Sequence, residues 1–96
     1  MFLSAYHFDG DPDELLPAYA RLNAMFPASV LQFHACVVRE GGLTVIDACP
    51  SRSIAEAFSD GPEFGHALVT AGLPAPRKER LGDVHAAFVS GEVVPT

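Results

Sequence analysis

The sequence contains no tryptophan and only two cysteines, Cys36 and Cys49, among its 96 residues. Two cysteines do not form the disulfide framework of small secreted domains, so free thiols and a cytoplasmic location are expected. Basic residues are also scarce, because six Lys and Arg stand against twelve Asp and Glu, for a formal net charge of −6. Nucleic-acid binding needs a basic surface stripe, and this composition argues against it.

Long apolar segments are missing as well. No run approaches the roughly 20 apolar residues of a membrane-spanning helix. The first residues, MFLSAYHFDGD, lack the basic start and apolar stretch of a signal peptide, so neither a leader nor membrane contact is expected. Hydrophobic residues nevertheless make up 49% of the chain, enough for a packed core. We expect one domain over residues 1–89 and a C-terminal tail over 90–96.

Alternation of apolar and polar residues predicts four strands, which we place at residues 2–8, 30–39, 43–49 and 79–89. A first helix is predicted to begin after Asp11, with Pro12 in its first turn, and to end at Pro27. A capping box at Ser53 and Glu56 and a second start near Pro62 predict a helix that is broken in two and ends at Gly72.

The predicted order, βαββαβ, is that of an α+β, ferredoxin-like domain. Right-handed crossovers place the first and third strands at the centre of a four-stranded antiparallel sheet, in the order 4-1-3-2. Each of the two crossover connections then contains one helical region, and both helical regions lie on the same face of the sheet. The other face of the sheet has no helix to cover it.

Because side chains alternate along a strand, each predicted strand contributes to both faces of the sheet. The set expected under the helices is largely apolar: Phe2, Ser4, Tyr6, Phe8, Leu31, Phe33, Ala35, Val37, Thr44, Ile46, Ala48, Val84, Ala86 and Phe88. The set expected on the open face is more mixed: Leu3, Ala5, His7, Gln32, His34, Cys36, Val38, Val45, Asp47, Cys49, Asp83, His85, Ala87 and Val89. A semi-apolar face with convergent polar groups predicts a homodimer interface that encloses a lumen.

This element order, together with the broken-helix stretch AEAFSDGPEFGHAL, resembles the dimeric α/β-barrel superfamily. That superfamily includes antibiotic-biosynthesis-type monooxygenases, haem-degrading enzymes and polyketide cyclases. The resemblance implies a homodimer in which two ferredoxin-like sheets face each other. It also implies a small-molecule enzyme, either a cofactor-free monooxygenase or a cyclase, that acts on an aromatic or polyketide-like substrate.

Haem binding is not expected from the same resemblance. Haem degraders of this superfamily carry an axial His one turn after an aromatic residue of the broken helix, and they rely on Trp. Here Leu68 stands one turn after Phe64, His66 is out of register, and tryptophan is absent. We therefore expect no haem and no other cofactor.

Three histidines of the expected open face, His7, His34 and His85, are candidate general acids or bases, because imidazole titrates near neutral pH. Asp47 is the candidate partner that orients one imidazole or stabilises its cation. A metal site built from these four residues is not expected, because their spacing is not local.

Further candidate contacts to a substrate are Tyr6, Gln32 and Cys36. A hairpin loop at Gly41 and Gly42 predicts a register in which Cys36 lies opposite Asp47. Tyr6 and Tyr19 are expected in the core between sheet and helices, with satisfied hydroxyl groups as the ordinary alternative to a binding role.

The alternative to an enzyme is a non-catalytic small-molecule-binding or assembly module, in which the histidines serve only the interface. An open pocket that touches two or more of these histidines would favour the enzyme. A filled lumen would favour the module.

Overall fold

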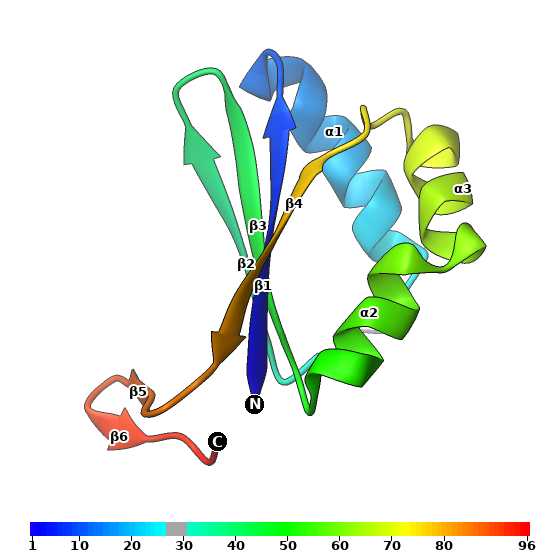
Figure 1. Ribbon diagram of the computed structural model, residues 1–96. Coiled ribbons are helices and arrows are strands. Elements are labelled where there is room, and N and C mark those ends of the chain that lie inside the picture. The colour runs from blue at the N-terminus through cyan, green and yellow to red at the C-terminus, as the bar shows by residue number, and fades with distance from the viewer. Residues whose placement is uncertain (27–30) are drawn as a thin grey trace.

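Four strands form one antiparallel sheet in the computed structural model, which describes residues 1–26 and 31–96. They are β1 (Phe2–Asp9), β2 (Phe33–Arg39), β3 (Gly42–Cys49) and β4 (Arg77–Asp83), in the order β2-β3-β1-β4. The helices α1 (Pro12–Ala24), α2 (Arg52–Asp60) and α3 (Pro62–Ala71) all cover one face of the sheet (Figure 1). This arrangement is consistent with a ferredoxin-like fold and confirms the predicted fold class and strand order.

The helix boundaries follow local capping chemistry. The Asp11 side chain accepts a hydrogen bond from the backbone N–H of Asp13 and so caps α1 as predicted. The cap of α2 is Ser51, two residues before the predicted one, and its hydroxyl accepts from the backbone N–H of Ile54. A left-handed Gly72, with φ of 89°, ends α3. Pro27 and residue 30, parts of the predicted first helix and second strand, lie outside the described residues.

The main core fills the layer between sheet and helices. Its buried residues come from β1, α1, β3, α3 and the segment just after α3: Tyr6, Phe8, Leu15, Ala18, Leu43, Val45, Phe64, Leu68 and Leu73. The backbones of β1 and β3 approach closely at Gly42, where a Cβ atom would lie 2.0 Å from the Phe8 carbonyl oxygen. Only glycine allows this approach, so Gly42 fixes how β3 begins beside β1.

The face predicted for β1 is correct, but the faces predicted for β2 and β3 are wrong. The hairpin loop is Glu40–Gly41, so Arg39 pairs with Gly42 and Cys36 pairs with Val45 rather than Asp47. That shift of two residues keeps the same side chains together, so it does not exchange the faces. They are exchanged because Val45 lies opposite Tyr6, and Asp47 opposite Ser4, in the β1–β3 pairing. Val45 and Asp47 therefore face the helices, while Thr44, Ile46 and Ala48 lie on the open face. Because side chains alternate, a shift of one residue in the register between two strands moves every side chain of one strand to the other face of the sheet.

The last predicted strand, residues 79–89, is also wrong in its extent. β4 ends at Asp83, and a separate hairpin follows, β5 (Phe88–Val89) and β6 (Glu92–Val93). This hairpin projects beyond the end of the sheet, away from the helices (Figure 1). The residues of β4 that face the helices are Lys78 and Arg80, which bond to the C-terminal end of α2, rather than the predicted Val84, Ala86 and Phe88.

Across residues 1–26 and 31–96, no helix has both the length and the apolar character needed to cross a membrane.

Candidate functional site

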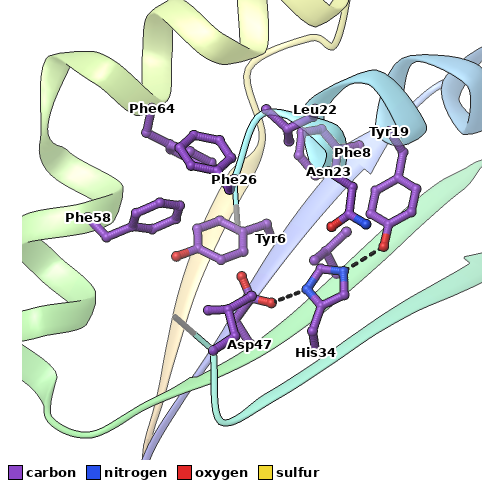
Figure 2. Close-up of a pocket in the computed structure, with 12 residues that line it drawn as sticks. Tyr6, Phe8, Tyr19, Leu22, Asn23, Phe26, His34, Asp47, Phe58 and Phe64 are labelled. Carbon is purple, nitrogen blue, oxygen red and sulfur yellow. Dashed lines mark hydrogen bonds and ion pairs between the residues drawn. The ribbon is translucent and has the colours of Figure 1, made fainter. Parts of the chain in front are cut away.

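A small cavity of about 50 Å³ lies between the sheet and the helices. Its lining is aromatic and aliphatic except at one wall: Tyr6, Phe8, Tyr19, Leu22, Asn23, Phe26, Leu31, His34, Val45, Asp47, Phe58 and Phe64. The sheet contributes the floor, α1 one side, and the α2–α3 junction the other (Figure 2). The cavity has room for a few water molecules or for the reacting end of a small ligand.

The polar wall is a hydrogen-bonded triad of Asp47, His34 and Tyr19. His34 Nδ1 lies 2.5 Å from Asp47 Oδ1, and His34 Nε2 lies 2.5 Å from the Tyr19 hydroxyl (Figure 2). An ionised carboxylate only accepts, so Nδ1–H donates to Asp47 and Nε2 accepts from the Tyr19 hydroxyl. The imidazole is thus the middle member of a relay between a carboxylate and a phenol.

The strands and α1 hold this triad in place. His34 lies directly opposite Asp47 in the β2–β3 pairing, which brings two adjacent side chains to the helix-covered face. Tyr19 reaches them from α1, and its ring is nearly parallel to the imidazole, at an interplanar angle of 7°. Two rigid strands and one helix therefore fix the three side chains relative to one another.

Burial sets the electrostatics of the triad. Burial raises the pKa of Asp47, while the hydrogen bond from His34 and the charge of that imidazole oppose the rise. Burial also raises the pKa of Tyr19, helped by Cys36 and Asp47. A phenol that resists ionisation stays a proton donor to His34 at neutral pH, so the triad can relay a proton rather than store a tyrosinate.

Tyr6 forms the wall next to Asp47. Burial, with a smaller effect from the charge of Asp47, raises the pKa of Tyr6 to about 12. Its ring packs against Phe64 with 5.5 Å between centroids, and Phe64 in turn packs against Phe58 at 5.0 Å. The carboxylate and imidazole therefore face a largely apolar, aromatic space (Figure 2).

The predicted histidines do not meet on one face. His34 lines the cavity under the helices, whereas His7 lies on the open face, where it bonds to Thr44 and Glu79. His85 lies beyond the end of β4, near the start of β1, while His7 lies near the end of β1. The expected cluster of three histidines with Asp47 is therefore wrong: only His34 and Asp47 come together, and the cavity touches one of the three histidines rather than the two or more that would favour an enzyme.

The other predicted contacts divide in the same way. Tyr6 lines the cavity, but Gln32 and Cys36 do not. The backbone N–H of Gln32 donates to the Ala48 carbonyl, and Cys36 packs beside the core. In the described part of the chain, no group of three or more His, Cys, Asp or Glu side chains is placed to hold a metal ion.

Sequence reasoning placed Tyr19 in the core but missed its bond to His34, and it missed Asn23 and Phe58 altogether. Tyr19 and His34 belong to different elements, fifteen residues apart, and no local pattern links them. Asn23 is an exposed residue at the cavity rim, near the end of α1 (Figure 2). The sequence feature that could have identified Asn23 is its position one helical turn after Tyr19, which puts both residues on the same side of the helix.

Comparisons of this chain with protein-family models, with curated proteins and with solved structures found no match.

Proposed function

We propose that this protein is a small-molecule enzyme in which the Asp47–His34–Tyr19 triad transfers a proton to and from a substrate in the aromatic cavity. The observation that carries the proposal is the unbroken relay from a buried carboxylate through an imidazole to a phenol at a cavity wall. Acid–base residues commonly have such desolvated, charge-coupled surroundings.

In this proposal Tyr19 takes a proton from the substrate while its own hydroxyl proton passes to His34 Nε2. The products are a substrate anion and an imidazolium, so charge is conserved. Asp47, 2.5 Å from Nδ1, stabilises that imidazolium. A carbon acid next to a carbonyl suits this step, because its anion is an enolate that an apolar cavity with a few polar groups can hold.

Cofactor-free oxygenation and cyclisation of an aromatic or polyketide-like molecule both begin with such a deprotonation. The resemblance to the dimeric α/β-barrel superfamily supports these two reactions as the outcome of the step. The aromatic lining of the cavity supports a substrate with apolar or aromatic character. Neither histidine outside the cavity, His7 or His85, takes part.

The direct test is hydrogen–deuterium exchange at the carbon beside the carbonyl of 2-tetralone in D2O, followed by proton NMR. We expect the wild-type protein to accelerate exchange over buffer, and Tyr19→Phe to reduce that acceleration by on the order of 100-fold, the usual size of a general acid–base contribution. Phenylalanine keeps the ring and its packing. An unchanged rate in the variant, or no acceleration by the wild type, would contradict the proposal.

A non-catalytic binding module is the second candidate, and one observation favours it. Both imidazole nitrogens of His34 already have partners, so the triad is satisfied without a ligand. Binding of 2-tetralone without exchange would favour this alternative.

We also propose that the open face pairs with the same face of a second copy. Apolar side chains on this side of the sheet are strongly exposed, with Phe33 at 44%, Val37 at 45% and Leu81 at 50%. No helix covers them (Figure 1). An apolar patch on an uncovered sheet is typical of an interface between chains.

A further inference from the structure

A second, larger cavity of about 230 Å³ lies at the junction of α2 and α3. It is lined by Phe26, Ala57, Phe58, Gly61, Pro62, Glu63 and Phe64. The helix break creates it, because Gly61 is extended and Pro62 starts a new helix in another direction. A Cβ atom at Gly61 would lie 2.9 Å from the Ala57 carbonyl oxygen, so the break tolerates little besides glycine.

The junction cavity and the cavity with the triad share one wall. Phe26, Phe58 and Phe64 line both cavities. Their rings meet at an angle instead of stacking flat, at 75° for Phe26 with Phe58 and 44° for Phe58 with Phe64. Tilted and edge contacts of this kind are ordinary aromatic packing, and Lys78 Nζ also lies over the Phe64 ring, 5.8 Å from its centroid.

The two cavities differ in size and in chemistry. The triad cavity is small and holds the polar atoms, whereas the junction cavity is more than four times as large and, among its described lining residues, has Glu63 as the only charged one. A molecule that only filled the triad cavity would leave the larger apolar space to water. A molecule with a polar head and an apolar arm would fill both if its arm passes the side chains of Phe26, Phe58 and Phe64, which line both cavities.

We propose that the junction cavity is the subsite for an apolar arm of the substrate, whose carbonyl head reacts at the triad. The inference rests on the proposed function for the identity of the head. It assigns a substrate class, namely neutral ketones that carry an alkyl or aryl arm of several carbons. Asp47 lines the triad cavity and Glu63 the junction cavity, and no Lys or Arg is among the described lining residues, so an anionic substrate is disfavoured.

Binding of 2-pentanone, 2-heptanone and 2-nonanone, measured by NMR titration, tests the subsite without any need for turnover. Burial of each added methylene is expected to tighten binding by up to about fourfold, so that 2-nonanone binds at least about tenfold more tightly than 2-pentanone. Equal affinities for the three ketones, or no binding of 2-nonanone, would overturn the subsite.

Chain length also increases non-specific hydrophobic binding, so a blocking variant is required. Ala57 lines the junction cavity and not the triad cavity, and it is exposed, so Ala57→Trp places an indole in the cavity without disturbing the core. We expect Ala57→Trp to remove the gain from chain length and to leave 2-pentanone binding within about twofold of the wild type. Ala57→Leu, a smaller replacement, should reduce the gain only partly.

Ala20→Trp is the matched control, since Ala20 is an exposed alanine of α1 that lines neither cavity. The wild-type chain has no tryptophan, so the emission of each new indole reports whether it lies in an apolar site. A full chain-length gain in Ala57→Trp, or the same loss in Ala20→Trp, would overturn the subsite. Failure of proton exchange with an intact chain-length gain would overturn the proposed chemistry and leave the subsite standing.

Discussion

Two histidine–carboxylate pairs lie on opposite faces of the same sheet. On the helix-covered face, His34 and Asp47 lie 2.5 Å apart, with side chains 25% and 10% exposed. On the open face, His7 and Glu79 lie 2.8 Å apart, with side chains 17% and 47% exposed. The residue types and the pairing are alike, but the surroundings of the two carboxylates differ.

The second ring nitrogen of each imidazole also has a different hydrogen-bond partner. His34 meets the Tyr19 phenol beside a cavity, whereas His7 meets the Thr44 hydroxyl, which also accepts from Arg39. The open-face pair thus belongs to a surface network, and exposed pairs of this kind contribute little to stability. The difference in burial lies in the carboxylates, because the Asp47 side chain is 10% exposed and that of Glu79 is 47% exposed, and only His34 lies beside a cavity.

The largest expected effect separates two consecutive residues of β3. Val45 is buried under the helices, while Ile46 faces the open side. Val45→Lys would bury an unpaired charge, so we expect a loss of roughly 3–5 kcal/mol in the free energy of unfolding, enough to unfold a small domain. Ile46→Lys should change it by less than about 1 kcal/mol in the monomer. Urea unfolding followed by circular dichroism measures both.

Ile46→Lys also tests the open face as an interface. If two copies pair there, the lysine should convert a dimer to a monomer in light scattering while the fold is kept. Equal destabilisation by the two lysines would show that both faces of β3 are buried to the same degree. A wild-type protein that is monomeric at micromolar concentration would contradict the dimer proposal.

Val45 and Ile46 also show which part of the fold the sequence did not predict. The strand order was predictable because capping residues, glycine turns and the crossover rule all agreed on it. The faces of β2 and β3 were not, because both sets of alternating residues in β3 contain apolar side chains, Val45 on one side and Ile46 on the other. The faces depend on the β1–β3 register, in which Val45 lies opposite Tyr6. The hairpin loop, Glu40–Gly41, is one residue earlier than the glycine pair suggested, which shifts the β2–β3 pairing by two residues and keeps the faces.

The site was obscured for a second reason. Polar residues are usually expected away from the core, so His34 and Asp47 were placed on the open face. Asp47 is buried and His34 is partly buried beneath the helices, because each satisfies the other and Tyr19 satisfies the remaining nitrogen. Such compensation joins three elements and has no periodic signature in the sequence. The pairing of Asp47 with one histidine was anticipated, but not which side of the sheet carries it.

The next effect compares the two histidines directly. His34→Gln should lower the exchange rate with 2-tetralone by about 100- to 1,000-fold, because glutamine cannot accept and release a proton as imidazole does. His7→Gln, the same substitution on the open face, should change it by less than about threefold. The proton NMR assay measures both variants. Similar losses in the two variants would mean that the open-face pair also takes part, which would remove the contrast between the faces.

A smaller effect, the pH dependence of stability at alkaline pH, tests how far water is excluded from the helix-covered face. The pKa of Tyr6 is raised from its ordinary value near 10 to about 12, so the folded state favours the protonated phenol. That contribution is fully present below pH 10 and is lost as the pH rises from 10 to 12, amounting to roughly 2–3 kcal/mol at 1.36 kcal/mol per pH unit. The raised pKa of Tyr19 acts in the same direction.

Urea unfolding between pH 9 and 12 tests this effect, with Tyr6→Phe as the control that keeps the ring. The variant should lose less stability across that range than the wild type, because every other alkaline titration is common to both proteins. Identical pH dependences would mean that Tyr6 is as hydrated as an open-face residue.

The smallest effect comes from the carboxylates themselves. Because burial raises the pKa of Asp47, the folded protein holds the proton more tightly than the unfolded chain does. The stability that this proton confers is present at acidic pH and is lost as the pH rises through the folded pKa. Asp47→Asn keeps an oxygen that accepts from His34 Nδ1–H but removes the buried charge. We therefore expect the variant to gain stability relative to the wild type as the pH rises to neutrality, by on the order of 1 kcal/mol.

Glu79→Gln makes the same change in the open-face pair, where the carboxylate is half exposed. We expect it to alter the free energy of unfolding by less than about 0.5 kcal/mol at both pH 4 and pH 7, because water already solvates that carboxylate. Urea unfolding of the two variants at these pH values gives the comparison. A pH-dependent gain in Glu79→Gln that matched the gain in Asp47→Asn would show that the two faces solvate a carboxylate equally. The difference between the histidines would then have to come from Tyr19 alone.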